Sequence, residues 1–350
     1  FLYSDKDQIT ADGTQRLAPL FKPAWSPELM WNANYLTHLC AMRTQDVRAV
    51  GGWRRETDGA QDWDLFLRVI RLGGAVRHVP HVLYHWRQLA TSVAAGGLDA
   101  KPYAADGQVR AVADHCAALG LTVEVRRADT GDLRLVWPWP SEWKASIVLT
   151  GCRDEGAQAK AEYLARHTSP GHFEILFAAE FEAPSAGPLR SVRVAPECSV
   201  QQQVEQLAAA ATGNLLVVLD AVCDPAGPSW LLELCGPLQS AEIGLVGARL
   251  LDAATRVLRH AGLVVNNDGA VDALYAGQPE HVYEVFGGAG WYRNWSAVSG
   301  GALALRRETW LSLDGLGGTL EHPRLDVHLC LKLTARTGLR ILYNPYATLL

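Results

Sequence analysis

The feature that most constrains this chain is an internal repeat. Shifting the sequence by 264 positions brings like residues together: Arg43 with Arg307, Gly51 with Gly315, Asp62 with Asp326, Leu65 with Leu329, Leu67 with Leu331, Arg68 with Lys332 and Gly74 with Gly338. Matches spread over about forty residues, almost without gaps, predict two copies of one supersecondary unit. Any fold for the chain therefore has to contain the same arrangement twice.

Each copy carries the same pattern of apolar residues and glycines. The pattern predicts strands at 39–43 and 301–306, short helices at 44–52 and 308–315, longer helices that begin at Asp62 and Asp326, and final strands at 75–80 and 339–345. Apolar residues recur at helical spacing in the longer helices, and glycine follows each of them. The repeated unit is therefore strand, short helix, helix and strand.

Strands alternate with helices ahead of the second copy. The expected elements are strands at 145–150, 172–179 and 214–220, with helices at 157–167 and 200–213 between them. Such alternation predicts an α/β fold in which helices flank a mostly parallel sheet. The first copy lacks this front half, and Phe1 opens within a strand-like run, so we expect a fragment cut at both ends.

These observations predict three segments. Residues 1–98 form the C-terminal half of a first domain, 99–143 a connecting helix and strands, and 144–350 a second, nearly complete domain cut at its C-terminus. The boundary near 143 is marked by the Pro/Trp-rich stretch "WPWPSEW". If residue 1 is the true start, the first domain lacks its front half, and we expect the isolated fragment to be inactive.

Composition excludes several classes of protein. The net charge of -5 argues against a nucleic-acid binder, which usually carries a basic face. Apolar residues make up 49% of the chain and predict a sizeable packed core, yet no apolar run is long enough to span a bilayer. The 7 cysteines are scattered without a CxxC pair, which argues against a disulfide framework or a zinc site.

Two pairs of acids are the first candidates for chemistry. Asp5 and Asp7 in "YSDKDQI" flank one residue, on an expected turn after a strand, where they could share one Mg²⁺ or Mn²⁺ ion. Asp62 and Asp64 in "GAQDWDLFLR" stand at an expected helix start. Capping needs one acid, so the other could serve as a general base. For each pair the alternative is structural: a solvated turn for the first and helix capping for the second.

The stretch "YHWR" supplies the remaining candidates. His85 could complete a metal shell, and Arg87 could bind phosphate through two hydrogen bonds. Trp86 is a candidate for contact with a substrate, because aromatic rings stack on sugars. A lone histidine near a strand end is more often simply hydrogen-bonded, and most tryptophans lie in cores or interfaces.

In combination these stretches resemble a known family. "YSDKDQI", "FKPAWSPELMWNANYLTHLCAMR", "VGGWR", "GAQDWDLFLR", "VLYHWR" and "AKPYA" are similar to family 2 glycosyltransferases of the GT-A fold, in particular to the bacterial tandem type that builds surface polysaccharide. The resemblance implies a Rossmann-like sheet flanked by helices, in one partial and one nearly complete copy. It also implies an inverting, metal-dependent transfer of a hexose-type sugar from a nucleotide-sugar donor to a glycan or lipid-linked glycan acceptor.

The resemblance assigns a role to each candidate. Asp5 and Asp7 match the DxD motif that holds Mg²⁺ or Mn²⁺ on the donor diphosphate, and His85 matches a position that can join those contacts. Asp62 matches the general base that activates the acceptor hydroxyl, while Asp64 caps the helix, braces the loop or contacts substrate. Trp86 and Arg87 are looser matches to substrate-binding positions.

The second copy keeps the strands and helices of the fold but lacks several of the polar motif residues that the family carries. Aligning "LDAVCDP" with "YSDKD" puts Val222 opposite Asp5 and Asp224 opposite Asp7, and a slip of the alignment would use Asp220 instead. Asp326 survives opposite Asp62, but a histidine replaces the second acid. We therefore expect a weak or inactive transferase kept for acceptor binding or architecture. The competing view is a metal-independent or shifted site.

Two other classes remain as alternatives. One is a non-catalytic carbohydrate-binding or scaffolding protein with a transferase-like fold. The other is a nucleotidyltransferase, although the glycine-rich phosphate loop that such enzymes need is absent from the sequence. We expect a cytoplasmic protein, with peripheral association at the inner face of the cell membrane left open by the resemblance, and no nucleic-acid partner.

Overall fold

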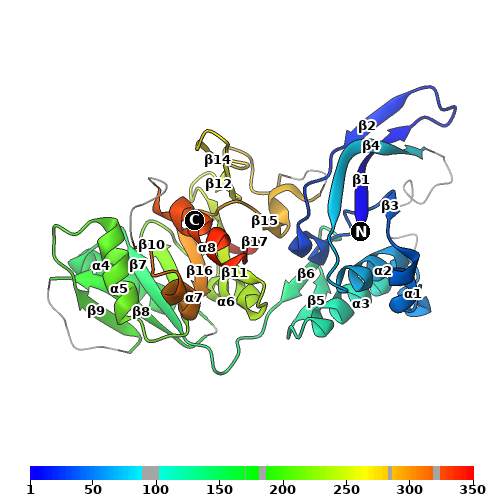
Figure 1. Ribbon diagram of the computed structural model, residues 1–350. Coiled ribbons are helices and arrows are strands. Elements are labelled where there is room, and N and C mark those ends of the chain that lie inside the picture. Colours follow the sequence, from blue (N-terminus) through cyan, green and yellow to red (C-terminus); the bar gives the residue numbers. More distant parts are fainter. Residues whose placement is uncertain (89–101, 170, 181–186, 283–285, 318–323) are drawn as a thin grey trace. The chain divides into compact units, whose positions relative to one another are not determined.

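The computed structural model describes residues 1–350 except 89–101, 170, 181–186, 283–285 and 318–323. The start of the predicted connecting segment, residues 99–101, thus lies outside the described part. The chain divides into two compact units, Phe1–Val136 and Trp137–Leu350, and each is described by itself (Figure 1). In the described residues, no helix is both long and apolar enough to cross a membrane.

The first unit is built around strand β1. Its strands are β1 (Leu2–Ile9), β2 (Arg16–Leu20), β3 (Cys40–Ala41), β4 (Arg77–Arg87), β5 (Glu124–Arg127) and β6 (Leu133–Val136). Its α-helices are α1 (Thr44–Ala49), α2 (Gln61–Ile70) and α3 (Pro102–Ala118), with 3₁₀ turns at Pro27–Trp31 and Arg55–Thr57. Strand β4 pairs with β1 in parallel, whereas β2 and β3 pair with it in the antiparallel sense.

The pairing of β1 corrects one prediction. The ladder between β1 and β4 continues to the pair Ile9–Arg87, so the two acids of "YSDKDQI" lie inside a strand rather than on a turn after it. Sequence reasoning missed this because two aspartates in a short polar run are typical of turns. Here hydrogen bonding to a neighbouring strand outweighs that local preference.

The second unit contains a nine-stranded mixed sheet within the described residues. The sheet strands are β7 (Ala145–Thr150), β8 (Phe173–Ala179), β9 (Leu189–Arg193), β10 (Leu215–Asp220), β11 (Ile243–Leu251), β12 (Leu258–His260), β15 (Arg293–Asn294), β16 (Ala302–Arg306) and β17 (Arg340–Leu349). The order is β15-β17-β11-β16-β10-β7-β8-β9, with β12 paired to β11. A separate ribbon joins β13 (Leu263–Val265) and β14 (Val271–Ala273).

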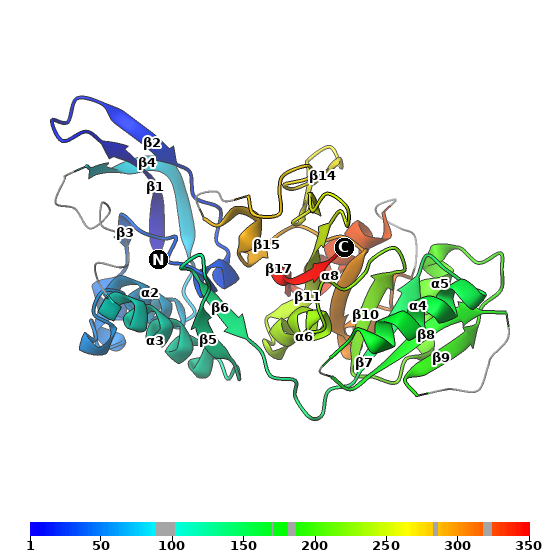
Figure 2. The same cartoon turned by 180° about the vertical axis from the view of Figure 1, so that it is seen from behind.

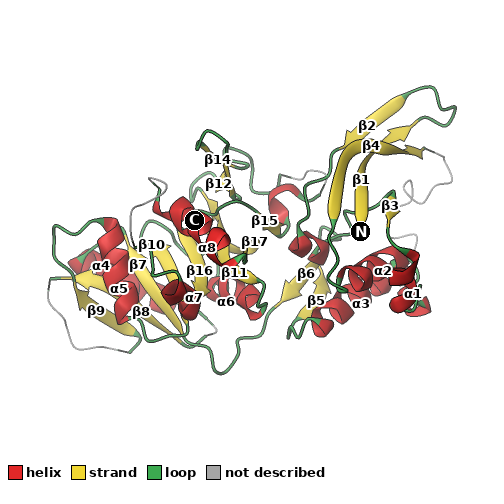
Figure 3. Cartoon of the chain, in the orientation of Figure 1, coloured by secondary structure: helices red, strands yellow, loops and turns green. Residues whose placement is uncertain are grey.

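Helices of the second unit alternate with its strands, as the colours of Figure 3 show. They are α4 (Asp154–Arg166), α5 (Val200–Ala210), α6 (Trp230–Cys235), α7 (Arg307–Ser312) and α8 (Leu325–Thr337), with 3₁₀ turns at Gly236–Gln239 and Gly288–Gly290. Helices α4 and α5 pack against β8 and β9, beside which they lie in both views (Figure 2). Helix α6 packs against β17 and β11, and α8 against β17.

The predicted fold class, α/β, is confirmed. Strands β9, β8, β7 and β10 pair in parallel, as the alternation of strands and helices predicted. All six residues of β7 are buried, because neighbouring strands and helices cover it, which explains why four of the six are apolar. Strand β16 is antiparallel to both of its neighbours and makes the second half of the sheet mixed.

Local signals explain where the key helices begin and end. Ser199 accepts a hydrogen bond from the backbone N–H of Gln202 at 3.2 Å, while the Gln202 side chain accepts one from the Ser199 N–H, so a capping box starts α5. Gly338, with φ of 70°, ends α8 in the left-handed conformation that glycine adopts without strain. One hydrophobic cluster of the second unit packs residues of α5, α7 and α8 against the sheet.

Candidate functional site

Asp5, the first predicted metal ligand, is buried and hydrogen-bonded inside the sheet. Its Oδ1 accepts a hydrogen bond from the backbone N–H of Lys22 at 2.8 Å and lies 2.7 Å from Nε2 of His78 on β4. Residues two apart on a strand point to the same face, so Asp5 and Asp7 share one side of β1. Their shared side is therefore covered by protein partners.

Asp7 is buried in the same way. One of its carboxylate oxygens contacts Nε of Arg16 and the other contacts Nδ1 of His85, each at 2.5 Å. His85, the third predicted metal ligand, is thus a partner of Asp7. These contacts give both oxygens of Asp7 a charged or polar neighbour within the protein.

The predicted metal ligands do not fit a divalent cation as they are placed. Among the described residues, no group of three or more His, Cys, Asp or Glu side chains could hold a metal ion. Both oxygens of Asp7 contact Arg16 or His85, and Oδ1 of Asp5 contacts His78, so these three oxygens already have partners in the protein. Metal dependence therefore stays a prediction from the resemblance.

Asp62 occupies the second position of helix α2. Its Oδ1 accepts a hydrogen bond from the backbone N–H of Trp63 at 2.8 Å, and no ion pair to Asp62 occurs in the described part of the chain. Burial raises the pKa of the Asp62 carboxyl above its ordinary value, and the hydrogen bond from Trp63 offsets this only in part. No hydrogen bond among the described residues connects it with Asp5 or Asp7.

Asp64 is an internal ion-pair partner. Its side chain is only 1% exposed and contacts the guanidinium groups of Arg54 and Arg68. Burial alone would raise the pKa of Asp64, but the hydrogen bonds from Arg68 and Arg54 outweigh it and hold the pKa below its ordinary value. The two neighbouring acids of α2 therefore have opposite electrostatic surroundings, and Asp64 braces the loop that contains Arg54.

Trp86 and Arg87 end strand β4. The Nη1 of Arg87 donates a hydrogen bond to the carbonyl of Ala11 at 2.8 Å, so this side chain holds the turn between β1 and β2. The ammonium of Lys6 lies 4.9 Å from the centre of the Trp86 ring. Both side chains thus have structural contacts, and their substrate-binding roles stay predictions.

The two copies of the repeat place their surviving acids alike. Asp326 stands at the second position of α8, as Asp62 does in α2, and its Oδ1 accepts a hydrogen bond from the next backbone N–H, of Val327, at 2.8 Å. The paired cations Arg68 and Lys332 also act alike: each reaches back to carbonyl groups of the glycine turn that precedes the helix. The repeat in the sequence is therefore a repeat of local geometry.

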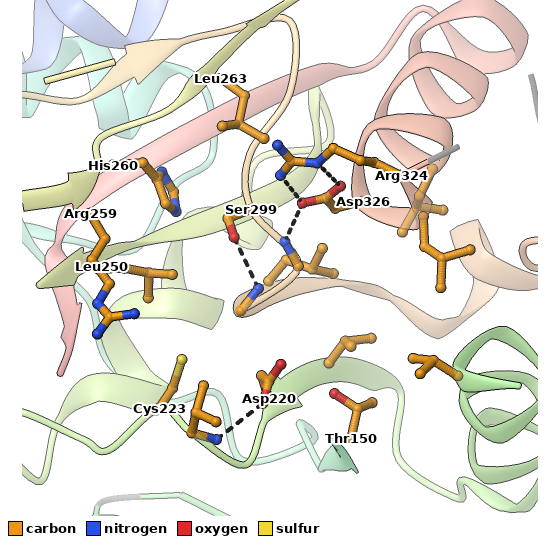
Figure 4. Close-up of a pocket in the computed structure, with 18 of the residues that line it drawn as sticks. Thr150, Asp220, Cys223, Leu250, Arg259, His260, Leu263, Ser299, Arg324 and Asp326 are labelled. Atoms are coloured by element: carbon orange, nitrogen blue, oxygen red, sulfur yellow. Dashed lines mark hydrogen bonds and ion pairs between the residues drawn. The ribbon is translucent and has the colours of Figure 1, made fainter. Parts of the chain in front are cut away.

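A cavity of about 770 Å³ lies within the second unit and is lined by all three of the doubtful second-copy acids, Asp220, Asp224 and Asp326. Figure 4 shows Asp220 on one side of this cavity and Asp326 on the facing side. Most other lining residues are apolar, with Arg259, His260 and Arg324 among the exceptions. A mostly apolar pocket with a few convergent polar groups is the usual form of a ligand site.

The Asp326 carboxylate is fixed in place by hydrogen bonds from two neighbouring residues. Its Oδ2 accepts hydrogen bonds from the Gly300 N–H at 2.9 Å and from Nη2 of Arg324 at 2.7 Å (Figure 4). Burial alone would raise the pKa of Asp326, but the hydrogen bonds from Arg324 and Gly300 outweigh it and hold the pKa below its ordinary value. In contrast to Asp62, this carboxylate has a charged partner and is a weaker base.

Asp220 and Asp224 flank a short loop after strand β10. Oδ1 of Asp220 accepts a hydrogen bond from the backbone N–H of Val222 at 3.1 Å. The Asp224 carboxylate contacts Nζ of Lys160, on helix α4, at 2.5 Å. The Asp224 backbone N–H and carbonyl also exchange hydrogen bonds with those of Leu350, which fixes the loop beside β17.

Sequence reasoning missed the basic side of this cavity. Arg259 and His260 belong to β12, within "LRHAGLVV", a stretch that the sequence analysis did not single out. His260 is 4% exposed and its Nδ1 accepts a hydrogen bond from the backbone N–H of Gly262 at 2.9 Å. Its Nε2 is buried without a hydrogen-bond partner among the described residues. The signal that could have indicated them is a pair of basic residues that interrupts an otherwise apolar stretch.

Comparison with known proteins finds similarity along the whole chain. No family model matches it. It is 32% identical over 363 residues to an O-antigen biosynthesis protein, RfbC, from Myxococcus xanthus, a match that covers 100% of this chain and 28% of the relative. It is 30% identical over 376 residues to the uncharacterized protein y4gI of Sinorhizobium fredii, which covers 99% of this chain and 40% of that protein. The chain thus spans less than half the length of either relative.

Solved structures resemble the chain only distantly. One of them is described as GalNAc-T7 with UDP, GalNAc and Mn²⁺. It is 15% identical, with a TM-score of 0.44, over 66% of this chain and 47% of the other. Such a likeness carries no argument about function. The chain is therefore similar along its full length to a segment of an O-antigen biosynthesis protein, and its motifs and α/β sheet are consistent with a GT-A glycosyltransferase.

Proposed function

We propose that this chain is part of a glycosyltransferase that moves a sugar from a nucleoside-diphosphate donor to a glycan or lipid-linked glycan during surface polysaccharide synthesis. The motif combination around Asp62 supports this function, and so does the similarity to a segment of an O-antigen biosynthesis protein. The cavity of the second unit, with carboxylates on facing walls, adds a ligand site of suitable size.

The observation that carries the assignment is the contrast between two carboxylates in equivalent positions. Asp62 has no ion-pair partner among the described residues and a raised pKa, whereas Asp326 is paired with Arg324 and has a lowered pKa. A general base works best when its pKa approaches the working pH. Asp62 is therefore the proposed base, and the second unit is proposed to bind ligand with weak or no transfer activity of its own.

The proposed reaction needs one proton transfer and one displacement. The acceptor hydroxyl gives its proton to the Asp62 carboxylate as its oxygen forms a bond to the anomeric carbon. The bond from that carbon to the donor phosphate oxygen breaks on the opposite side, and the electron pair leaves with the nucleoside diphosphate. In-line attack of this kind inverts the anomeric centre.

The test is sugar transfer by the intact protein with Asp62→Asn and Asp326→Asn as a matched pair. Each change removes a base at the second position of an equivalent helix while keeping an acceptor oxygen. With a panel of nucleotide-sugars, we expect Asp62→Asn to lower transfer by about 10²-fold or more and Asp326→Asn to change it little. Loss of a linkage only in Asp326→Asn would refute this division of roles.

A non-catalytic carbohydrate-binding protein is the second candidate, favoured by the ion pair that occupies Asp326. The same assay separates the two candidates. If the wild-type protein turns over no nucleotide-sugar but binds glycans, and Asp62→Asn binds them equally well, the catalytic proposal fails and the binding protein remains.

A further inference from the structure

The carboxylate of Asp326 already accepts as many hydrogen bonds as it can hold. Arg324 donates to both of its oxygens, from Nε to Oδ1 at 3.1 Å and from Nη2 to Oδ2 at 2.7 Å. The backbone N–H groups of Val327 and Gly300 donate to Oδ1 at 2.8 Å and to Oδ2 at 2.9 Å. An ionised carboxylate offers about four lone-pair sites, and these donors fill them. A substrate hydroxyl therefore finds no free site on Asp326 to which it could give its proton.

Asp62, at the equivalent place in the first unit, is not filled in this way. Among the described residues, the Trp63 N–H is the one group of another residue that donates a hydrogen bond to it. The two units differ at the N-cap residue of the helix, which is Ala60 before α2 and Arg324 before α8. These two residues are 264 positions apart, as Asp62 and Asp326 are, so they match in the repeat. An alanine side chain has no donor and leaves the carboxylate open.

Arg324 can be removed without dismantling the site. Its side chain is 44% exposed, that of Asp326 is 12% exposed, and both line the cavity of the second unit (Figure 4). An ion pair with such an exposed partner contributes little to stability. Without Arg324, the N–H groups of Gly300 and Val327 would still hold the carboxylate, and about two of its lone-pair sites would become free.

We infer that Arg324 is an autoinhibitory mask on Asp326, so that the base of the second unit is blocked by one side chain and is not lost. This inference rests on the proposed function, because it takes Asp326 to be the counterpart of the base Asp62. It assigns the difference between the two carboxylates to a single position of the repeat. In the unmasked unit the acceptor hydroxyl gives its proton to Asp326, by the same proton transfer and displacement as proposed for Asp62.

The first measurement is carboxyl labelling of the whole chain with a water-soluble carbodiimide and glycine ethyl ester, read residue by residue by mass spectrometry. The variant is Arg324→Ala. The control is Arg259→Ala, which removes another exposed arginine of the cavity lining, one that is paired with Asp252. We expect Asp326 to be labelled about fivefold faster in Arg324→Ala than in the wild-type protein, and at the wild-type rate in Arg259→Ala. A rise at both Asp252 and Asp326 in Arg324→Ala would mean a loosened unit and would overturn the inference.

The second measurement is sugar transfer from a panel of nucleotide-sugars in an Asp62→Asn background, where the proposed base of the first unit is absent. Adding Arg324→Ala should raise transfer about tenfold, and adding Asp326→Asn as well should abolish the gain. Adding Arg259→Ala instead should leave transfer unchanged.

Two results would overturn the inference and leave the proposed function intact. One is slow labelling of Asp326 in Arg324→Ala, and the other is transfer that does not rise when Arg324→Ala is added to Asp62→Asn. Absence of transfer by the wild-type protein would instead refute the proposed function, and the labelling rates would still decide whether Arg324 masks the carboxylate.

Discussion

Replacing Asp64 by asparagine should destabilise helix α2 far more than replacing Asp62, two positions earlier. Asp64 is 1% exposed and is the carboxylate partner of Arg68, which is itself buried. Removing one member of a buried ion pair leaves the other charge uncompensated and costs about 3–5 kcal/mol. The lower end of that range applies here, because the Arg68 guanidinium keeps hydrogen bonds of 2.6 Å to the carbonyls of Val50 and Gly52.

Asp62→Asn is the matched control for this prediction. An asparagine oxygen can still accept the hydrogen bond from the Trp63 N–H, and the carboxylate that is lost had no ion pair among the described residues. The raised pKa of Asp62 means that, above its folded-state pKa, the buried charge opposes folding. We therefore expect Asp62→Asn to change stability by less than about 1 kcal/mol at pH 7.

Native-state hydrogen exchange of the α2 amides is the assay, because it reads this helix separately from the second unit. The free energy of opening should fall by about 3 kcal/mol in Asp64→Asn and stay near the wild-type value in Asp62→Asn. If Asp64→Asn kept wild-type protection, or if both variants lost the same amount, the assignment of Asp64 as the brace would be wrong. The result also decides whether lost activity in Asp62→Asn can be attributed to chemistry.

Two further predictions concern acid and packing. Because the folded-state pKa of Asp64 is lowered, its stabilising contribution is present above its unfolded pKa of about 4 and is lost as pH falls toward the folded value, so circular dichroism should show acid unfolding that is blunted in Asp64→Asn. Gly247→Ala should lower the melting temperature, at a cost of about 1–3 kcal/mol, since its new Cβ would lie 2.3 Å from Cβ of Val298. Gly156→Ala, in open space on α4, should raise the melting temperature, because it should increase the free energy of unfolding by about 0.5–1 kcal/mol. Equal melting temperatures for the two variants would contradict the packing argument.

The sequence predicted the elements of the repeat well, because their signals are local. Periodic apolar residues and the glycine at 338 mark α8, and the paired acids at 62 and 326 mark equivalent helix starts. Alternating strands and helices were enough to predict the α/β class. What failed was the turn at Asp5 and Asp7, since the ladder with β4 depends on residues more than seventy positions away.

The candidate site could be predicted only in part. Asp220 and Asp326 were named from the alignment of the two copies, but that alignment does not say whether the two acids share a cavity. The contact between Lys160 and Asp224 joins a helix to a loop far along the chain, and no motif marks it. His260 was missed because its burial, with no hydrogen-bond partner for Nε2 among the described residues, is a property of packing that has no sequence pattern.

The hydrogen bonds from Arg68 and Lys332 to the glycine turns have a consequence for how such repeats diverge. Arg68 and Lys332 differ chemically, yet each ties its helix to backbone carbonyls, which are present whatever the side chains there become. A hydrogen bond to the main chain can hold the helix in place while the neighbouring side chains are substituted. One copy thus has His328 where the other has an aspartate, while the carboxylate at the helix start keeps its place, so side chains in a duplicated unit can change with its architecture intact.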